Sequence, residues 1–430
     1  MRRYVKILML LLAMWMLGGC SMRTVEQLYC LPKRSQAYNN LQLVIDEAMK
    51  NLTFSAPTYG ENRQPVQMAD LDGDGVDEVL LFARDNSEKP LKILIFSQLA
   101  SGYVLMDTIE GYGLGFDFVE YAQLDDRAGM EIVVGRQVSD QVVRALSVYR
   151  FTSGTARQLL ATGYNRLEVC DLDGDEQKEL FLLTHSSVED GNGHVSLYHY
   201  QNGEMRGSEE QTISLPASRF SRFTEGKLED GRMAMYVTCE TDNKTMVTDI
   251  FIFENGKMHT VAKGLDSQSW QDYRVYPSDV DGDGIMESAK LIPIESVDAG
   301  KPSYLLQWYS VDQAGVSYTK CYTYHNYAEG WFAMVDSDLT DRLLVEIAEE
   351  ETIFHFLQSG KPTRILSILA LTDADRETEA DKEDRLILYK SDAVIYVADL
   401  TEAAKDIGVT QELLKSKFFP IRAEKSNEEN

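Results

Sequence analysis

Basic residues are scarce in this sequence, because 42 lysines and arginines stand against 69 aspartates and glutamates in 430 residues, for a formal net charge of −27. Removal of the first 20 residues, which contain three basic groups and no acidic one, would leave 39 basic groups and a charge of −30. Nucleic-acid binding depends on basic surface that pairs with phosphates. No nucleic-acid partner is therefore expected, and much of the acidic excess is expected to lie on a solvated surface.

Cysteines and catalytic motifs are scarce too. The five cysteines have neither the spacing of a metal site nor that of a disulfide framework, so free thiols are expected at Cys30, Cys170, Cys239 and Cys321. The sequence contains no G-x-S-x-G, H-E-x-x-H or G-x-x-x-x-G-K-[ST] motif. We therefore expect a protein that is not an enzyme.

Long apolar runs are missing after the first 20 residues, where three basic residues precede an apolar run that is too short to span a membrane as a helix. This segment has the pattern of a secretory signal, and its end, Leu17-Gly18-Gly19-Cys20, resembles a bacterial lipobox. The resemblance implies that Cys20 carries a lipid and that 21–39 is a tether. An ordinary cleaved signal or an uncleaved anchor is the alternative.

An acidic nine-residue pattern is present three times, with aspartates at positions 1, 3 and 5 and a glutamate at position 9. Together with the carbonyl at position 7, these residues supply the oxygen ligands that calcium prefers. The three predicted calcium ligand sets are Asp70, Asp72, Asp74, Val76 and Glu78; Asp171, Asp173, Asp175, Gln177 and Glu179; and Asp279, Asp281, Asp283, Ile285 and Glu287.

These stretches are not EF-hands, because their twelfth positions hold Leu81, Leu182 and Lys290 in place of the required glutamate. An acidic hairpin without metal stays open as an alternative. Glycine at position 6 permits a left-handed turn, whereas Glu176 takes this position in the middle copy at a cost of about 1 kcal/mol. The middle site is therefore expected to be the weakest.

The acidic stretches belong to a longer repeat of about fifty residues, whose units start near 70, 123, 171, 226 and 279. The copies at 123–131 and 226–234 have lost ligands but keep the alternating strands and glycine-marked turns that follow. Each unit has the size of one four-stranded propeller blade, whereas solenoid repeats are shorter and sandwich domains longer. We therefore predict a mainly β fold, with a β-propeller at 40–325.

The repeat does not cover the whole chain. Apolar residues at helical spacing in 41–52 predict an amphipathic helix before the first unit. After 325 the period is lost, and further strands and a helix at 401–417, with Thr401 as a possible N-cap, predict a small C-terminal α+β domain at 326–422 or a closing blade. The tail, 423–430, is expected to be disordered.

On these residues the sequence resembles FG-GAP and VCBS repeats, which occur in integrin-like propellers and in many secreted bacterial proteins. The resemblance covers 66–320 and is strongest at 70–82, 171–183 and 279–287. With the lipobox, the whole arrangement resembles a bacterial FG-GAP/VCBS repeat lipoprotein. It implies calcium in the three loops and a cell-surface setting, usually for adhesion or ligand binding.

The function expected from these features is a non-catalytic binding or interaction module with calcium-stabilised loops, lipid-anchored at the extracytoplasmic face of a cell membrane. Its partners would be the membrane, through Cys20, and an unknown extracellular protein or glycan. Two alternatives stay open: an enzyme that acts on extracellular polysaccharide from a propeller scaffold, and a structural envelope protein.

Overall fold

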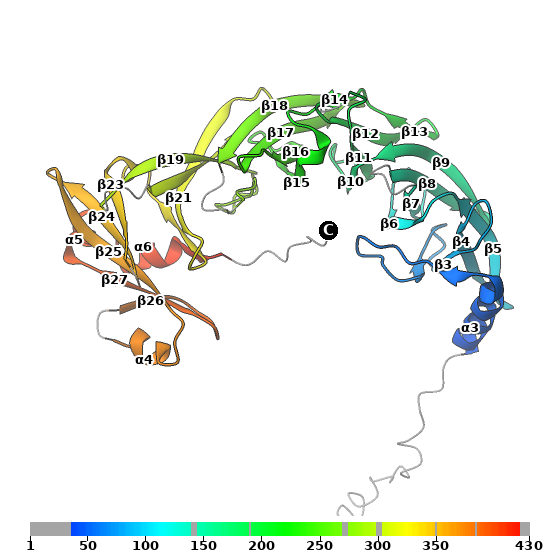
Figure 1. Cartoon of the computed structure of the whole chain (residues 1–430), viewed down its shortest axis with the longest axis horizontal. Helices are drawn as coiled ribbons and strands as arrows, with labels where there is room; N and C mark the ends of the chain where they lie inside the picture. Colours follow the sequence, from blue (N-terminus) through cyan, green and yellow to red (C-terminus); the bar gives the residue numbers. More distant parts are fainter. Residues whose placement is uncertain are drawn as a thin grey trace, which may run out of the picture.

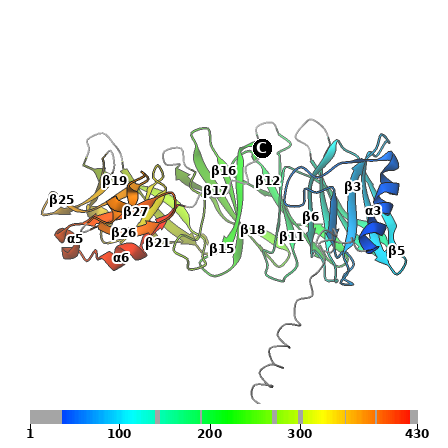
Figure 2. The same cartoon turned by 90° about the horizontal axis from the view of Figure 1, so that it is seen from below.

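The computed structural model describes residues 36–138, 144–188, 191–268, 274–297, 303–348, 351–382 and 385–421. The predicted signal with Cys20, most of the predicted tether, Cys30 and the predicted disordered tail lie outside these residues. The described chain is mainly β, and its sheets follow one another along an open arc from α3 (Gln36–Ala48) to the C-terminal region (Figure 1). Seen from below, the sheets stand side by side along that arc (Figure 2).

The first two sheets are antiparallel meanders in which the main strands pair in sequence order. Sheet one contains β2 (Val66–Ala69), β3 (Glu78–Arg84), β4 (Leu91–Leu99) and β5 (Gly102–Gly111), with β1 (Thr53–Phe54) as a further partner of β3. Sheet two contains β6 (Gly115–Ala122), β7 (Glu131–Gln137), β8 (Arg144–Thr152) and β9 (Thr155–Tyr164).

Sheets three and four repeat this order. Sheet three contains β10 (Arg166–Cys170), β11 (Glu179–Thr184), β12 (His194–Gln201) and β13 (Glu204–Gly207), with β14 (Gln211–Thr212) as a further partner of β12. Sheet four follows η2 (Ala217–Arg219) and contains β15 (Phe220–Lys227), β16 (Met233–Glu240), β17 (Thr245–Glu254) and β18 (Lys257–Gln268). These four-stranded units have the strand order of propeller blades.

Tight turns explain the regular connection from the third to the fourth strand. The two-residue turns Ser153-Gly154, Asn202-Gly203 and Asn255-Gly256 all have positive φ at both residues. This is the conformation of a type I′ turn, whose twist matches that of the two strands that it joins. The turns noticed in the sequence therefore mark the predicted hairpins correctly.

The core lies between successive sheets, because the inner strands of each sheet bury side chains on both faces. In β3, Leu80 and Phe82 pack against Phe116 and Val119 of sheet two, whereas Val79 and Leu81 point the other way. The outer face of sheet one is covered by α3 and by η1 (Met49–Asn51), as the predicted amphipathic helix requires. Each fully buried side chain of this kind contributes about 1.5–3 kcal/mol, so apolar packing holds the row of sheets together.

The C-terminal region is one nearly closed sheet of ten strands. A meander of β19 (Ser288–Ser296), β20 (Ser303–Val311), β21 (Ser317–Asn326) and β22 (Trp331–Val335) is followed by η3 (Thr340–Arg342). The remaining strands are β23 (Leu343–Ile347), β24 (Thr352–Gln358), β25 (Lys361–Leu371), β26 (Arg385–Lys390), β27 (Ile395–Leu400) and β28 (Phe418–Pro420). The remaining strands join this meander at one edge through the parallel pair β19–β23 and at the other edge through the antiparallel pair β22–β28.

Several predicted boundaries differ from this structure. The predicted domain limit at 325–326 falls within β21, because the fifth unit and the C-terminal strands share one sheet. The predicted helix at 401–417 is wrong: it is divided into α5 (Glu402–Asp406) and α6 (Gln411–Ser416) at Gly408, whose φ is +80°. A left-handed residue cannot continue an α-helix.

Other details refine the sequence predictions. Thr410, and not Thr401, uses its side chain as a cap, accepting the N–H of Leu413. The acidic stretch after β25 includes the helix α4 (Arg376–Ala380), and the predicted tether ends inside α3. Cys170, Cys239 and Cys321 are free thiols, as expected. Within the described residues, every helix is too short or too polar to cross a membrane.

Candidate metal-binding loops

The acidic stretches all connect the first strand of a sheet to the second. The first loop (70–78) joins β2 to β3, the second (123–131) joins β6 to β7, and the third (171–179) joins β10 to β11. The fifth loop (279–287) leads into β19, and the strand before it is reduced to a bridge between Ser278 and Glu287. The repeat starts predicted near 70, 123, 171 and 279 therefore correspond to equivalent places in the fold.

The fourth loop departs from its predicted frame. Only five residues, 228–232, connect β15 to β16, whereas eight residues connect the corresponding strands of the first three sheets, so this loop is three residues shorter. Its position 1 is Lys227, one residue later than the 226–234 alignment assumes. Buried Leu228 occupies the place of buried Leu71, Leu124 and Leu172 at position 2. The sequence alignment missed this deletion because the fourth loop lacks the regularly spaced aspartates by which the other loops were aligned.

The three complete loops share one set of hydrogen bonds, in which each aspartate accepts backbone N–H groups of its own loop. The position 1 aspartate receives two bonds, and those at positions 3 and 5 receive one each. In the fifth loop these bonds are from Gly282 and Gly284 to Asp279 (2.8 and 2.9 Å), from Asp283 to Asp281 (3.2 Å) and from Ile285 to Asp283 (2.8 Å). The first and third loops repeat them.

Position 6 of these loops is left-handed, as predicted. Gly75 and Gly284 have φ values of +85°, and Glu176 has φ of +72° in the third loop. For an L-residue with a Cβ this conformation costs about 1–2 kcal/mol. The strain expected at Glu176 is therefore present.

The glutamate at position 9 binds the start of its own loop in each of the four full-length loops, which are the first, second, third and fifth. Glu78, Glu131, Glu179 and Glu287 are buried, and each accepts the backbone N–H of position 2 at 2.8–3.1 Å. Burial is the main cause that raises the pKa of Glu179 to about 8 and that of Glu287 to about 7, and the neighbouring aspartates of each loop raise it further. A nearby cation would relieve this cost by favouring the charged form.

The carboxylates of the three complete loops converge. One oxygen from each of Asp171, Asp173, Asp175 and Glu179 lies within 4.8 Å of the others, and the fifth loop gathers Asp279, Asp281, Asp283 and Glu287 in the same way. In the first loop the gathered set is Asp70, Asp72 and Glu78, without Asp74. The position 7 residues Val76, Gln177 and Ile285 bond through N–H to the position 5 aspartate, and their carbonyl ligation stays a prediction.

A buried oxygen without a partner supports a cation in the fifth loop. Glu287 is 0% exposed, and its Oε1 has no hydrogen-bond partner among the described residues, while Oε2 accepts the N–H of Val280. Leaving a buried carboxylate oxygen unpaired is costly. An all-oxygen donor set of this kind suits a hard cation such as calcium.

Consecutive loops are linked to one another by a hydrogen bond that the sequence did not reveal. The N–H of position 8 donates to the carbonyl of position 1 in the preceding loop: Met130 to Asp70 (3.1 Å), Lys178 to Gln123 (2.7 Å) and Met286 to Lys227 (2.8 Å). The shape of each loop is thereby coupled to the docking of neighbouring sheets.

The third strand of each sheet supplies a side chain opposite the position 9 glutamate, which sequence analysis also missed. The registers of β3–β4, β7–β8, β11–β12 and β19–β20 place Ser97, Arg150, His199 and Ser310 one residue beyond the first pair of each ladder. His199 packs against Phe253 at 5.1 Å, and burial lowers its pKa. The only signal in the sequence was a similar distance, 19 to 23 residues, from the glutamate.

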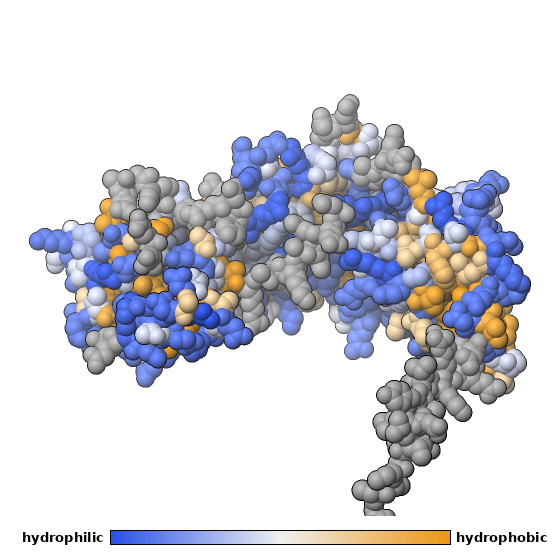
Figure 3. All heavy atoms as spheres, turned by 60° about the horizontal axis from the view of Figure 1, so that its bottom comes forward, coloured by the Kyte–Doolittle hydropathy of each residue, from blue (hydrophilic) through white to orange (hydrophobic). Residues whose placement is uncertain are grey.

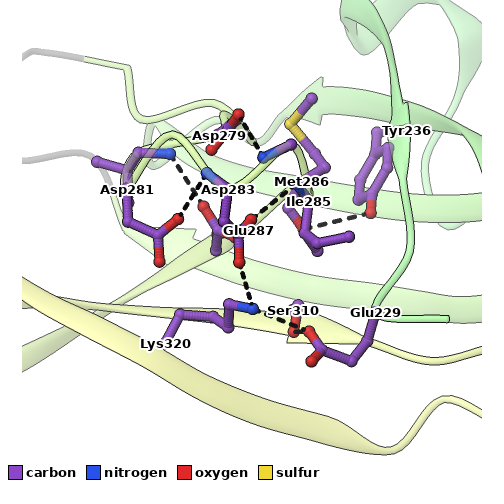
Figure 4. A network of polar contacts seen from close by, with 12 residues as sticks. Glu229, Tyr236, Asp279, Asp281, Asp283, Ile285, Met286, Glu287, Ser310 and Lys320 are labelled. Atoms are coloured by element: carbon purple, nitrogen blue, oxygen red, sulfur yellow. Dashed lines mark hydrogen bonds and ion pairs between the residues drawn. The ribbon is translucent and has the colours of Figure 1, made fainter. Parts of the chain in front are cut away.

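A lysine lies between the fourth and fifth loops. Lys320 of β21 forms ion pairs with Asp283 of the fifth loop (2.6 Å) and with Glu229 of the fourth loop (3.2 Å), and Ser310 donates to Glu229 (Figure 4). These pairs raise the pKa of Lys320 and lower that of Asp283. Lys320 therefore neutralises Glu229 of the shortened fourth loop and also pairs with one carboxylate oxygen of Asp283 in the fifth loop.

Comparisons with known proteins give no family. No family model matches the chain, so the FG-GAP and VCBS resemblance has no such support, and no curated protein matches either. Among solved structures, a rhamnogalacturonan lyase from Bacillus licheniformis is 13% identical with a TM-score of 0.30, over 74% of this chain and 71% of that chain. These values support no conclusion about function.

Two further solved structures have similarly low scores. The β-propeller domain of the trilobed protease from Pyrococcus furiosus is 12% identical with a TM-score of 0.28, over 81% of this chain and 93% of that chain. An α-L-arabinofuranosidase from Fusarium graminearum is 9% identical with a TM-score of 0.29, over 73% and 95%. The fold is therefore described from the strand pairing of this chain and not from these similarities.

Relief of the strain at Glu176 provides a first test. Glu176→Gly is expected to stabilise the protein by about 1 kcal/mol, because glycine adopts a positive φ without the Cβ penalty. Equilibrium denaturation in calcium measures the change. Gly174→Ala, at φ +77° with no atom within 4 Å of the added Cβ, is the control and is expected to destabilise. A less stable Glu176→Gly variant would contradict the assigned strain.

The buried glutamates predict a pH dependence. In calcium-free buffer the folded protein binds protons at Glu179 and Glu287 that the unfolded chain, with a pKa near 4.5, releases. Stability is therefore expected to fall as the pH rises from about 5 through about 8. Thermal unfolding across this range measures the fall. Calcium is expected to reduce it, because the ion replaces the proton, and an equal fall with and without calcium would be evidence against a shared site.

Proposed function

We propose that this protein is a calcium-stabilised, non-catalytic interaction module, held at the extracytoplasmic face of a cell membrane by a lipid on Cys20. The observation that carries the calcium assignment is the convergence of acidic side chains in three equivalent loops, within 4.8 Å in each. So many carboxylates are not expected to share a small volume in ionised form without a cation. The ligand sets are those predicted from the sequence.

The role of the ion is to fix the loop and, through it, the junction between sheets. Calcium offsets the repulsion among the carboxylates and the cost of burying the position 9 glutamate. The loop then presents its position 8 N–H to the preceding loop, as Lys178 does to Gln123. Affinity in the ~10⁻⁴ to 10⁻³ M range of extracellular modules suits a permanent structural ion.

A binding role has support from the surface. Apolar surface gathers at the N-terminal end of the arc (Figure 3), and large side chains exposed in this part of the chain include Leu99, Val104 and Leu105. Exposed apolar patches on soluble proteins commonly mark sites of interaction. The partner class is an extracellular protein or glycan, and the absence of catalytic sequence motifs favours binding over chemistry.

Calcium titration of residues 21–430 by calorimetry tests the first part of this proposal. We expect about three sites and a raised melting temperature. Asp72→Ala combined with Asp74→Ala is expected to remove one site and to lower the melting temperature in calcium but hardly in a chelator. Asp126→Ala, an exposed aspartate at position 4 of the second loop, is the control. No calcium binding, or equal losses of melting temperature in both buffers, would refute the assignment.

Membrane fractionation tests the anchor. Cys20→Ala is expected to move the protein from the membrane fraction to the soluble fraction, because one or more acyl chains supply the membrane affinity. The Asp126→Ala variant, which keeps Cys20, is expected to stay with the membrane. If the Cys20→Ala variant remained in the membrane fraction after detergent-free washing, lipid anchoring through this residue would be wrong.

A further inference from the structure

The second loop keeps the backbone of a metal loop although it has lost two of the acidic ligands. Gln123 and Arg127 stand at positions 1 and 5. Nevertheless Glu131 accepts the N–H of Leu124 at 2.9 Å, as the other position 9 glutamates do. Met130 also donates to the first loop at 3.1 Å. The features that depend on loop shape are therefore conserved within this chain without the full ligand set.

Two carboxylates remain at ligand positions of this loop, and both are buried. Asp125 at position 3 is 1% exposed and Glu131 at position 9 is 3% exposed. Two buried carboxylates without a counter-charge would cost several kcal/mol. A cation near them would offset this cost, as is proposed for the complete loops.

Arg150 of β8 supplies that cation. Its guanidinium forms an ion pair with Asp125, and its Nε lies 3.3 Å from Glu131 Oε1. The arginine is itself only 8% exposed and lies over the ring of Tyr200 in the next sheet, at 5.0 Å. It thus contacts the same two loop positions that would contact an ion and adds a contact across the sheet junction.

The equivalent strand position is small in two loops that keep acidic ligands. Ser97 in sheet one and Ser310 in the fifth unit stand opposite Glu78 and Glu287, where Arg150 stands opposite Glu131. A serine leaves room for an ion, whereas an arginine fills the space with its own charge. The third loop has His199 at this position, so among the four full-length loops only the second has an arginine there.

We propose that Arg150 is a covalently attached replacement for the metal ion of the second loop, so that this loop is a latent cation site closed by a side chain. This inference rests on the calcium role proposed for the other loops, and it adds that one of the four full-length loops is independent of calcium. Between sheets two and three, the contact of Arg150 with Tyr200 would then be one that does not depend on calcium.

The first test removes the positive charge of Arg150. In the full chain, Arg150→Ser is expected to lower the melting temperature by roughly 5 °C or more, equally with calcium and with chelator. The control is Arg157→Ser, which removes the same charge from the exposed residue paired with Arg150 across β8–β9. It is expected to change the melting temperature little. A loss in Arg150→Ser no larger than in this control would overturn the proposal.

The double variant Arg127→Asp with Arg150→Ser tests whether the second loop can bind calcium once its arginine is removed. It rebuilds carboxylates at positions 3, 5 and 9 beside an open space, so calorimetry is expected to show one calcium site more than in the unmodified chain, and calcium is expected to restore the melting temperature. The reciprocal variant Ser97→Arg is expected to show one site fewer.

These outcomes separate the two proposals. If the unmodified chain binds no calcium, the proposed function fails, and the replacement of a metal fails with it, even if the buried ion pairs prove stabilising in Arg150→Ser. If the unmodified chain binds calcium but the double variant gains no site and Ser97→Arg loses none, only the replacement by Arg150 is refuted.

Discussion

A buried carboxylate that needs a positive partner is the constraint on which the loop architecture depends. In each full-length loop the position 9 glutamate lies at or directly before the start of the strand that follows, accepts the N–H of position 2 and is buried. The hydrogen bond holds the loop over the sheet, but burial makes the charged form unfavourable. The surrounding groups therefore decide whether that glutamate is protonated or paired with a cation.

The repeats offer different solutions to this one electrostatic problem. Three loops gather aspartates that could hold calcium, the second loop uses Arg150, and the shortened fourth loop has its acidic residue Glu229 paired with Lys320. Loss of a metal ligand is tolerated because apolar contacts between sheets supply most of the packing, as with Leu80 and Phe116. The hydrogen bonds between consecutive loops then couple the shape of each loop to the junction beside it.

The need to cover apolar side chains explains how the arc ends. At its start, α3 covers the face of sheet one that has no neighbouring sheet, so the alternating side chains of β3 are buried on both faces. At its other end the fifth unit is extended by the parallel pair β19–β23 into a nearly closed sheet, whose core contains Tyr324, Trp331 and Phe354. Both ends use an added element in place of another blade, and Figure 1 shows the arc open between them.

The sequence by itself determined what depends on neighbours along the chain: the period of about fifty residues, the type I′ turns, the acidic loops between first and second strands, and the left-handed residue Glu176. These follow from local spacing, side-chain oxygens and φ preferences. The tertiary structure alone decided which charge faces each loop and where the sheets merge. Arg150, Lys320 and the β19–β23 pair act across strand registers and sheet junctions, where proximity comes from packing and not from sequence spacing.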